Sequence, residues 1–194
     1  RGQAMQAAVP VGEGAMAALL GVELDQALEF AAEGAKGGVC TAGNDNAPGQ
    51  VVISGDTAAV ERTLQIAVDN GAKRSIMLQV SAPFHCALMA PAAEVMAEEL
   101  AAAAMSPPAV PVIANVTAAE VTEPEEIRRL LIEQVTSLVR WRECVLYMRD
   151  NGVDTVVEIG AGKVLTGLSR RIDRDLTGIS VQTPDDLEAF AATL

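Results

Sequence analysis

The spacing of apolar residues in the first part of the chain alternates between a strand period and a helix period. Residues 14–20 form a short apolar run bounded by glycines, which is typical of a buried strand. Residues 24–32 repeat apolar side chains every three or four positions, which predicts a helix ended by the glycines that follow. The same reasoning predicts a second helix at 56–71 and further strands at 39–42, 51–53 and 75–80.

The predicted order over residues 14–81 is therefore strand, helix, strand, strand, helix, strand. This is the order of a ferredoxin-like unit, in which two strand–helix–strand motifs share one sheet. Residues 44–49 are dense in turn-forming side chains, so we interpret them as a loop between two of these strands.

Helix and strand patterns also alternate in the rest of the chain. Apolar strands are predicted at 110–116 and 153–159, with helices before, between and after them. This alternation favours a mostly parallel sheet in which both strands are buried on both faces. The predicted fold class is α/β.

The composition of the chain excludes several classes of function. The chain has 194 residues, half of them apolar, and a formal net charge of −12. This charge argues against nucleic acid as a ligand because phosphate binding needs a basic face, and the apolar content excludes a disordered chain. Three widely spaced cysteines and a single histidine suggest neither a disulfide framework nor a metal site. Because no apolar run has the length of a membrane span and no signal peptide is evident, we expect no membrane association and a cytoplasmic location.

His85 is the first candidate for chemistry. It follows a predicted strand at the start of a predicted helix, which is where open α/β sheets place their ligand crevices, and a histidine there can act as a general base. The alternative is a histidine that only packs or caps. None of the seven serines lies in a Gly-x-Ser-x-Gly elbow, so the chain holds a candidate base without an activated nucleophile.

Two further patterns each allow a binding role and a purely structural role. The glycines at 160–163 stand between a strand and a helix, where a phosphate could bind, but a tightly packed turn is the preferred interpretation. Basic residues cluster at 73–74, 128–129 and 170–174, where they could dock an acidic partner or simply form solvated salt bridges.

Four segments in order along the chain resemble a known family. They are 1–6 (RGQAMQ), 44–55 (NDNAPGQVVISG), 82–89 (APFHCALM) and 158–168 (EIGAGKVLTGL). They are similar to the malonyl-CoA:acyl carrier protein transacylases of bacterial fatty-acid synthesis, and the chain resembles the later three-fifths of such an enzyme. The family's nucleophile segment, with its Gly-x-Ser-x-Gly elbow, has no counterpart here. The absence of a starting Met at Arg1 agrees with this interpretation.

The resemblance implies a fold and a reaction. It implies part of an α/β-hydrolase-like core, formed by 1–13 and 82–194, with a ferredoxin-like subdomain inserted at 14–81. The reaction moves a malonyl group from coenzyme A to a serine, and then to the phosphopantetheine thiol of acyl carrier protein. No permanently bound cofactor is implied. The expected partners are acyl carrier protein and the missing serine-bearing segment, without which this chain is expected to be inactive.

The resemblance also assigns site residues. His85 corresponds to the base, Arg1 to the arginine that binds the malonyl carboxylate, Phe84 to the residue that limits the acyl pocket, and Asn46 to the lining of the cleft. Where many members have Pro-Val-Gln-Trp, this chain has Leu-Val-Arg-Trp at 138–141. The glutamine's backbone carbonyl orients the histidine in the family, so Arg140 is expected to offer the same carbonyl here.

Two alternatives remain open at this point. The chain could be a non-catalytic ferredoxin-like binding module on an α/β remnant, in which case Arg1 and His85 would lie far apart. It could also be an acyltransferase domain of polyketide type, which competition with methylmalonyl-CoA would reveal.

Overall fold

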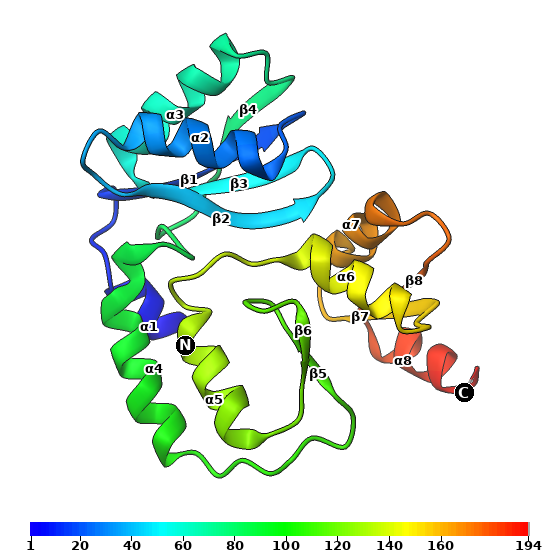
Figure 1. The fold of residues 1–194 in the computed structure, drawn as a ribbon. Helices are drawn as coiled ribbons and strands as arrows, with labels where there is room; N and C mark the ends of the chain where they lie inside the picture. The colour runs from blue at the N-terminus through cyan, green and yellow to red at the C-terminus, as the bar shows by residue number, and fades with distance from the viewer. Residues whose placement is uncertain (194) are drawn as a thin grey trace.

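The structure is a computed structural model that describes residues 1–193, and its fold class is α/β, as expected (Figure 1). The elements in chain order are α1 (Gly2–Ala7), β1 (Gly14–Leu20), α2 (Leu24–Ala35), β2 (Cys40–Ala47), β3 (Gln50–Asp56), α3 (Thr57–Asp69), β4 (Arg74–Met77), the 3₁₀ turn η1 (Ala87–Met89), α4 (Ala90–Ala102), β5 (Val112–Ala114), β6 (Ala119–Val121), α5 (Pro124–Glu133), α6 (Trp141–Asp150), β7 (Thr155–Ile159), α7 (Val164–Ile172), β8 (Thr177–Val181) and α8 (Pro184–Ala191).

The first part of the chain forms a four-stranded antiparallel sheet with the order β2-β3-β1-β4. Helices α2 and α3 cover one face of this sheet, so the predicted order of strands and helices is confirmed (Figure 1). The core between helices and sheet contains Leu19 and Ile53 from the strands and Val60 from α3, all of them fully buried. The alternation of side chains along each strand sends Met16, Ala18 and Val52 to the opposite face.

The sequence pattern predicts a loop at residues 44–47, but they belong to strand β2. Only Pro48 and Gly49 form the turn, and Ala47 pairs with Gln50 across it. The proline ring fixes its own φ, while Gly49 takes a φ of +66° that a side chain would disfavour. The register between β2 and β3 shifts twice, between Ala42 and Asn44 and between Asp45 and Ala47, so β2 is an irregular strand.

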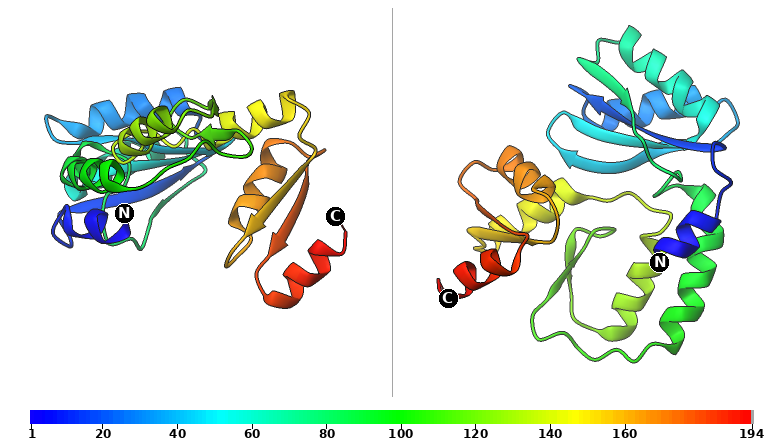
Figure 2. Two further views of the ribbon diagram at one scale, coloured as in Figure 1. Left: turned by 90° about the horizontal axis from the view of Figure 1, so that it is seen from below. Right: turned by 180° about the vertical axis from the view of Figure 1, so that it is seen from behind.

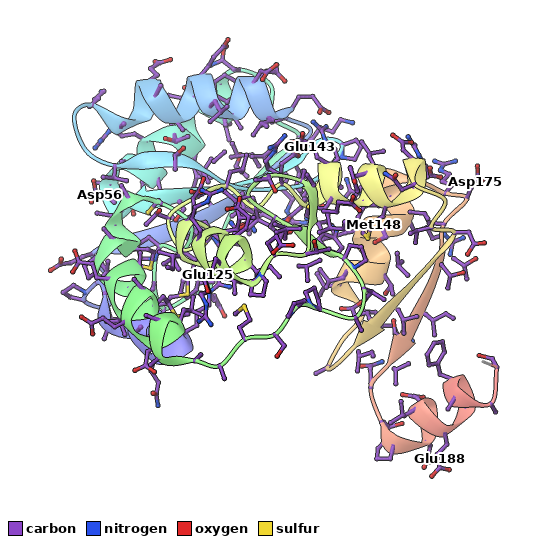
Figure 3. All side chains as sticks on the ribbon, turned by 60° about the horizontal axis from the view of Figure 1, so that its bottom comes forward. Asp56, Glu125, Glu143, Met148, Asp175 and Glu188 are labelled. Atoms are coloured by element: carbon purple, nitrogen blue, oxygen red, sulfur yellow. The ribbon has the colours of Figure 1, made fainter. Side chains whose placement is uncertain are left out.

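The remainder of the chain forms two smaller groups below the sheet. Helix α1 packs against α4 and α4 against α5, around buried Met5, Met89 and Val135. Helix α6 contacts both β2 and α7, and leads to the β7–β8 pair, which lies to one side with α7 and α8 (Figure 2). Glu143 and Met148 mark the course of α6 in Figure 3. No helix within residues 1–193 combines the length and apolar character required to cross a membrane.

The expectation of a mostly parallel sheet is wrong for these residues. Strands β5 and β6 pair antiparallel, and β7 with β8 is the parallel pair among the strands of residues 1–193. Neither predicted strand is buried on both faces, since Val112 of β5 is 40% exposed and Ile159 of β7 is 74% exposed. A two-stranded pair leaves much of each strand uncovered, which accounts for the difference.

Replacement of Gly55 by alanine is expected to destabilise the sheet. A Cβ there would lie 2.0 Å from the Val39 carbonyl oxygen and 2.7 Å from the Cys40 Cα, so backbone atoms would have to move. Overpacking of this kind costs about 3 kcal/mol of unfolding free energy, measurable by urea denaturation. Gly167→Ala is the matched control, because a Cβ there meets nothing within 4 Å and alanine favours helix α7. Equal stability of the two variants would contradict the prediction.

Candidate active site

His85 lies in the irregular segment between β4 and η1, not directly at a strand end, and it packs beneath strand β2. Its φ is +62°, which is unusual for a residue other than glycine. The close neighbour on β2 is Gly43: a Cβ at that position would lie 3.6 Å from the His85 Cβ and 3.3 Å from the Phe84 carbonyl oxygen. A small residue at position 43 therefore lets the strand approach the histidine.

A backbone carbonyl fixes the imidazole. The Nδ1 atom of His85 lies 2.9 Å from the carbonyl oxygen of Gln134. Because a carbonyl oxygen only accepts, this contact requires the proton on Nδ1 and leaves a lone pair on Nε2. Gln134 caps the C-terminus of α5, where carbonyls have no partner within the helix. Its side-chain Nε2 donates to the Ser137 carbonyl at 2.9 Å, which holds the residue in place.

The surroundings lower the pKa of His85. Burial is the main cause, and the positive charge of Arg1 acts in the same direction, while the bond to Gln134 opposes both. The lowered pKa favours the neutral imidazole, which can accept a proton at Nε2, as a general base must.

We expect His85 to titrate below the ordinary value of about 6.5. The chain has one histidine, so its Cε1 proton can be followed by NMR without assignment. Between the folded and unfolded pKa values the unfolded chain binds more protons, so the unfolding free energy should fall as the pH drops from about 6.5 through the folded pKa. A midpoint in the folded chain equal to that in concentrated urea would contradict this expectation.

Arg1 lines a cavity next to the histidine's partner. The cavity measures about 120 Å³ and lies between α5 and the β5–β6 hairpin. Gln134 lines it together with Arg1, and apolar side chains that include Ile113 and Leu130 form most of the rest. Among residues 1–193 no carboxylate forms an ion pair with the Arg1 side chain. The structure thus brings together His85, Gln134 and an arginine that can still accept an anion.

Phe84 and Asn46, the two other candidate residues, differ in their contacts with the site. Phe84, adjacent to His85, packs between the lower face of the sheet and the α1–α4 core, which suits a residue that shapes a pocket. Asn46 is partly buried in β2, and its side chain makes no hydrogen bond within residues 1–193. The structure therefore places Phe84 beside the histidine but records no contact that joins Asn46 to it.

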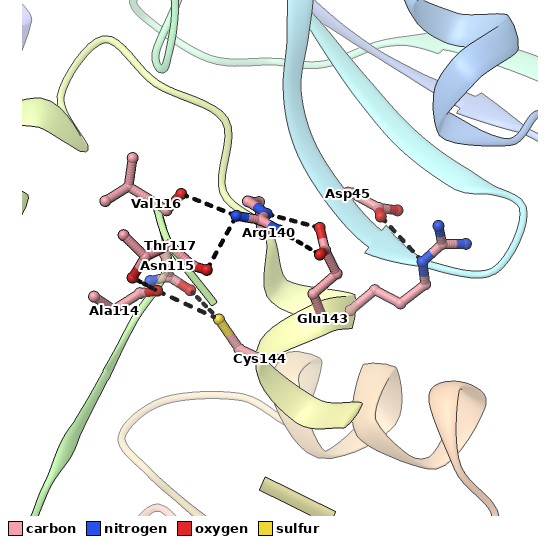
Figure 4. Close-up of polar contacts among 9 residues, drawn as sticks. Asp45, Ala114, Asn115, Val116, Thr117, Arg140, Glu143 and Cys144 are labelled. Carbon is pink, nitrogen blue, oxygen red and sulfur yellow. Dashed lines mark hydrogen bonds and ion pairs between the residues drawn. The ribbon is translucent and has the colours of Figure 1, made fainter. Parts of the chain in front are cut away.

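The expectation that the Arg140 carbonyl orients His85 is wrong. That carbonyl accepts from the Cys144 amide at 2.9 Å, as the first hydrogen bond of α6. The Arg140 guanidinium is engaged too, because it binds Glu143 at 2.7 Å and the Thr117 carbonyl at 3.0 Å (Figure 4). The sequence does not point to Gln134, because its role depends on its backbone carbonyl. The available signal is its position at the end of α5, where the last carbonyls have no partner within the helix.

The glycine turn at 160–163 is not an open phosphate site. The carboxylate of Glu158 accepts hydrogen bonds from the amides of Leu165 and Thr166, at 3.1 and 2.8 Å, and so occupies the N-terminus of α7. The interpretation as a packed turn is consistent with this arrangement.

The second and third of the three basic clusters differ in how their cations are paired. Arg129 pairs with Glu126 and Glu133 on the surface of α5. By contrast, Arg170 and Arg174 of the third cluster line a hollow of about 630 Å³ beside β8, together with Lys163. An acidic partner could bind these cations.

The chain is similar to known proteins along nearly its whole length. The chain is 46% identical, over 197 residues, to the malonyl CoA-acyl carrier protein transacylase of Bacillus subtilis (strain 168), and the match covers 100% of this chain and 62% of that protein. The crystal structure of the acyl-carrier-protein S-malonyltransferase from Bartonella henselae is 49% identical with a TM-score of 0.94, and covers 99% of this chain and 61% of that one. A malonyl-transacylase solved in complex with a type II polyketide acyl carrier protein is 39% identical with a TM-score of 0.94, over 100% of this chain and 62% of that one.

The chain thus spans about three-fifths of the length of the relatives it matches. The family model described as the acyl transferase domain matches residues 1–182, nearly the whole of the chain. The chain belongs to the acyl transferase domain family.

Proposed function

We propose that this chain is the histidine- and arginine-bearing part of a malonyl-CoA:acyl carrier protein transacylase of fatty-acid synthesis. The observation that carries the proposal is the contact of His85 Nδ1 with the Gln134 carbonyl, which leaves Nε2 free as a base. Relatives and structural neighbours named for this reaction support the choice of substrate. The nucleophile would be a serine in a segment that this chain does not contain.

In the first half of the reaction, His85 Nε2 takes the proton of that serine while its oxygen attacks the thioester carbonyl of malonyl-CoA. The carbon–sulfur bond then breaks, and the imidazolium returns the proton to the coenzyme A sulfur. In the second half, His85 takes the proton of the phosphopantetheine thiol, whose sulfur attacks the serine ester. The ester bond breaks and the serine oxygen regains the proton. The Gln134 carbonyl stabilises the imidazolium in both halves.

Arg1 would bind the malonyl carboxylate. Arg1 lines a cavity with mostly apolar walls, where a carboxylate would lose water and gain a planar, two-pronged donor from the guanidinium. Phe84, packed beside His85, would limit the acyl pocket to an unbranched chain. We assign Asn46 to the lining of the cleft on the resemblance alone.

We further propose two subdomains. Residues 14–81 would form a ferredoxin-like unit, which the strand order β2-β3-β1-β4 and the two helices on one face support. Residues 1–13 and 82–194 would belong to an α/β-hydrolase-like core completed by the serine-bearing segment. The exposure of apolar residues such as Ile159 and Val164, at 74% and 67%, fits strands and helices that another segment covers.

Acyl carrier protein would be the partner. The cations that line the hollow beside β8 offer a local basic patch on a chain of net charge −12. In addition, one structural neighbour was solved with an acyl carrier protein bound. The proposed compartment is the cytoplasm, in keeping with three unpaired thiols.

Intact-mass spectrometry after incubation with malonyl-CoA tests the proposal. The chain is assayed alone and mixed with the serine-bearing segment of the Bacillus subtilis relative. We expect no adduct on the chain alone, and a malonyl ester on the added segment that acyl carrier protein removes. A stable malonyl adduct on this chain would show that its nucleophile lies within residues 1–194.

A further inference from the structure

Asp45 is an unusual residue for the middle of a strand. It is fully buried in β2, and its Oδ1 has no hydrogen-bond partner among the described residues. Among residues 1–193 the cation at this carboxylate is Arg142, whose Nε lies 3.0 Å from Oδ2 (Figure 4). A buried carboxylate is costly unless it is paired, so Asp45 depends on this arginine.

Arg142 joins two parts of the molecule through that contact. It lies in the first turn of α6, and its Nη1 also binds Glu23 at 2.8 Å, at the N-cap of α2. The start of α6 is therefore fixed to residues 14–81 by one buried carboxylate, Asp45, and one exposed carboxylate, Glu23. The exposed contact to Glu23 adds little to stability, which leaves Asp45 as the principal anchor.

The same stretch of β2 holds the segment that precedes α6. Val139 donates to the Gly43 carbonyl and accepts from the Asp45 amide, both at 2.9 Å, in a parallel bridge at Asn44. Residues 134–140 thus run from the Gln134 carbonyl, which binds His85, to the anchored start of α6. Gly43 itself lies close to His85, since a Cβ at position 43 would be 3.6 Å from the His85 Cβ.

We propose that the Asp45–Arg142 ion pair is a positioning device for the imidazole of His85. It joins β2, which lies against the histidine at Gly43, to the start of α6. The 134–140 segment, whose first carbonyl selects the Nδ1–H tautomer, ends at that point. Neither residue touches the reacting atoms, so both are positioning residues. The inference rests on the proposed role of His85 as a base, and extends it to two residues outside the site.

The imidazole tautomer is the direct readout. Long-range ¹H–¹⁵N correlation spectra of the ¹⁵N-labelled 194-residue chain, at a pH above the His85 titration, report the ratio of Nδ1–H to Nε2–H. The wild type is expected in the Nδ1–H form. In Arg142→Gln and in Asp45→Asn the ratio should fall about fivefold, the equivalent of one neutral hydrogen bond. Arg142→Lys, which retains a cation, should keep most of the ratio.

Two comparisons separate positioning from general damage. Arg129→Gln makes the same chemical change at an exposed ion pair on α5, the helix that ends at Gln134, and should leave the ratio unchanged. The double variant Asp45→Asn, Arg142→Gln should be no worse than the worse single variant, because the two residues act through one contact. Fluorescence of Trp141, the single tryptophan, verifies that each variant is folded.

The outcomes are distinct. An unchanged tautomer ratio in either folded single variant overturns the proposal, as does an equal fall in Arg129→Gln. If Arg142→Gln does not fold, Asp45→Asn decides, because it leaves no unpaired buried charge. A wild-type chain that lacks the Nδ1–H form would instead contradict the Gln134 contact, and with it the proposed base.

Discussion

Replacement of His85 by alanine, in the enzyme completed with its serine-bearing segment, is expected to slow malonyl transfer by about 10²–10⁴-fold. The reason is the loss of an imidazole whose Nε2 lone pair is free and whose partner, the Gln134 carbonyl, can stabilise the positive charge that forms. Steady-state transfer from malonyl-CoA to acyl carrier protein measures the effect. The fall should appear in kcat as well as kcat/KM, since the base acts in the transition state.

A second variant removes the ambiguity of a folding defect. Because His85 has a φ of +62°, alanine adds backbone strain there, whereas asparagine tolerates this conformation. His85→Asn should therefore keep the fold and still lose activity, while Arg129→Gln should retain wild-type activity. Unchanged rates in His85→Asn would show that the histidine is structural.

The four-stranded sheet could be predicted because its signals are local. The strand β1, the helices α2 and α3 and the order of elements each follow from apolar spacing within a few residues. The error at 44–47 has a physical cause: polar residues in β2 were assigned to a loop, yet Asp45 is paired by Arg142, a residue almost one hundred positions later. Composition alone does not reveal a partner so distant in the sequence.

The pairing of the later strands depends on contacts that apolar spacing does not encode. A run such as Val153–Ile159 is equally apolar in a central strand and in a two-stranded pair. The burial of β5 and β7 is set by what covers them, and the structure leaves Val112 and Ile159 exposed. A prediction of strand identity was therefore possible there, and a prediction of sheet type was not.

The candidate site shows the same limit. His85 and Arg1 could be named from motifs, and in the structure both lie near Gln134, whose carbonyl binds the imidazole and which lines the same cavity as Arg1. The atom that orients the histidine is a main-chain oxygen, which carries no side-chain signature. The carbonyl that binds His85 belongs to Gln134, six residues before the expected Arg140, because α5 ends at Gln134.

Replacement of Arg1 by alanine in the completed enzyme is expected to lower kcat/KM for malonyl-CoA by about 10²-fold, with little change for acetyl-CoA. A carboxylate bound among apolar walls loses its water, so removal of its cationic partner costs about 2–5 kcal/mol of binding free energy. The arginine has no competing carboxylate among the residues that the structure describes, so its charge is available to substrate. Parallel transfer assays with the two thioesters measure the discrimination.

Arg1→Lys separates charge from geometry. Lysine keeps the cation but not the planar fork, so its discrimination between malonyl and acetyl groups should fall between those of the wild type and Arg1→Ala. The His85 titration provides an independent check: because the Arg1 charge lowers the pKa of His85, that pKa should rise in Arg1→Ala and stay close to the wild-type value in Arg1→Lys. If discrimination survives in Arg1→Ala while the His85 pKa rises, then Arg1 acts on the base and another group binds the malonyl carboxylate.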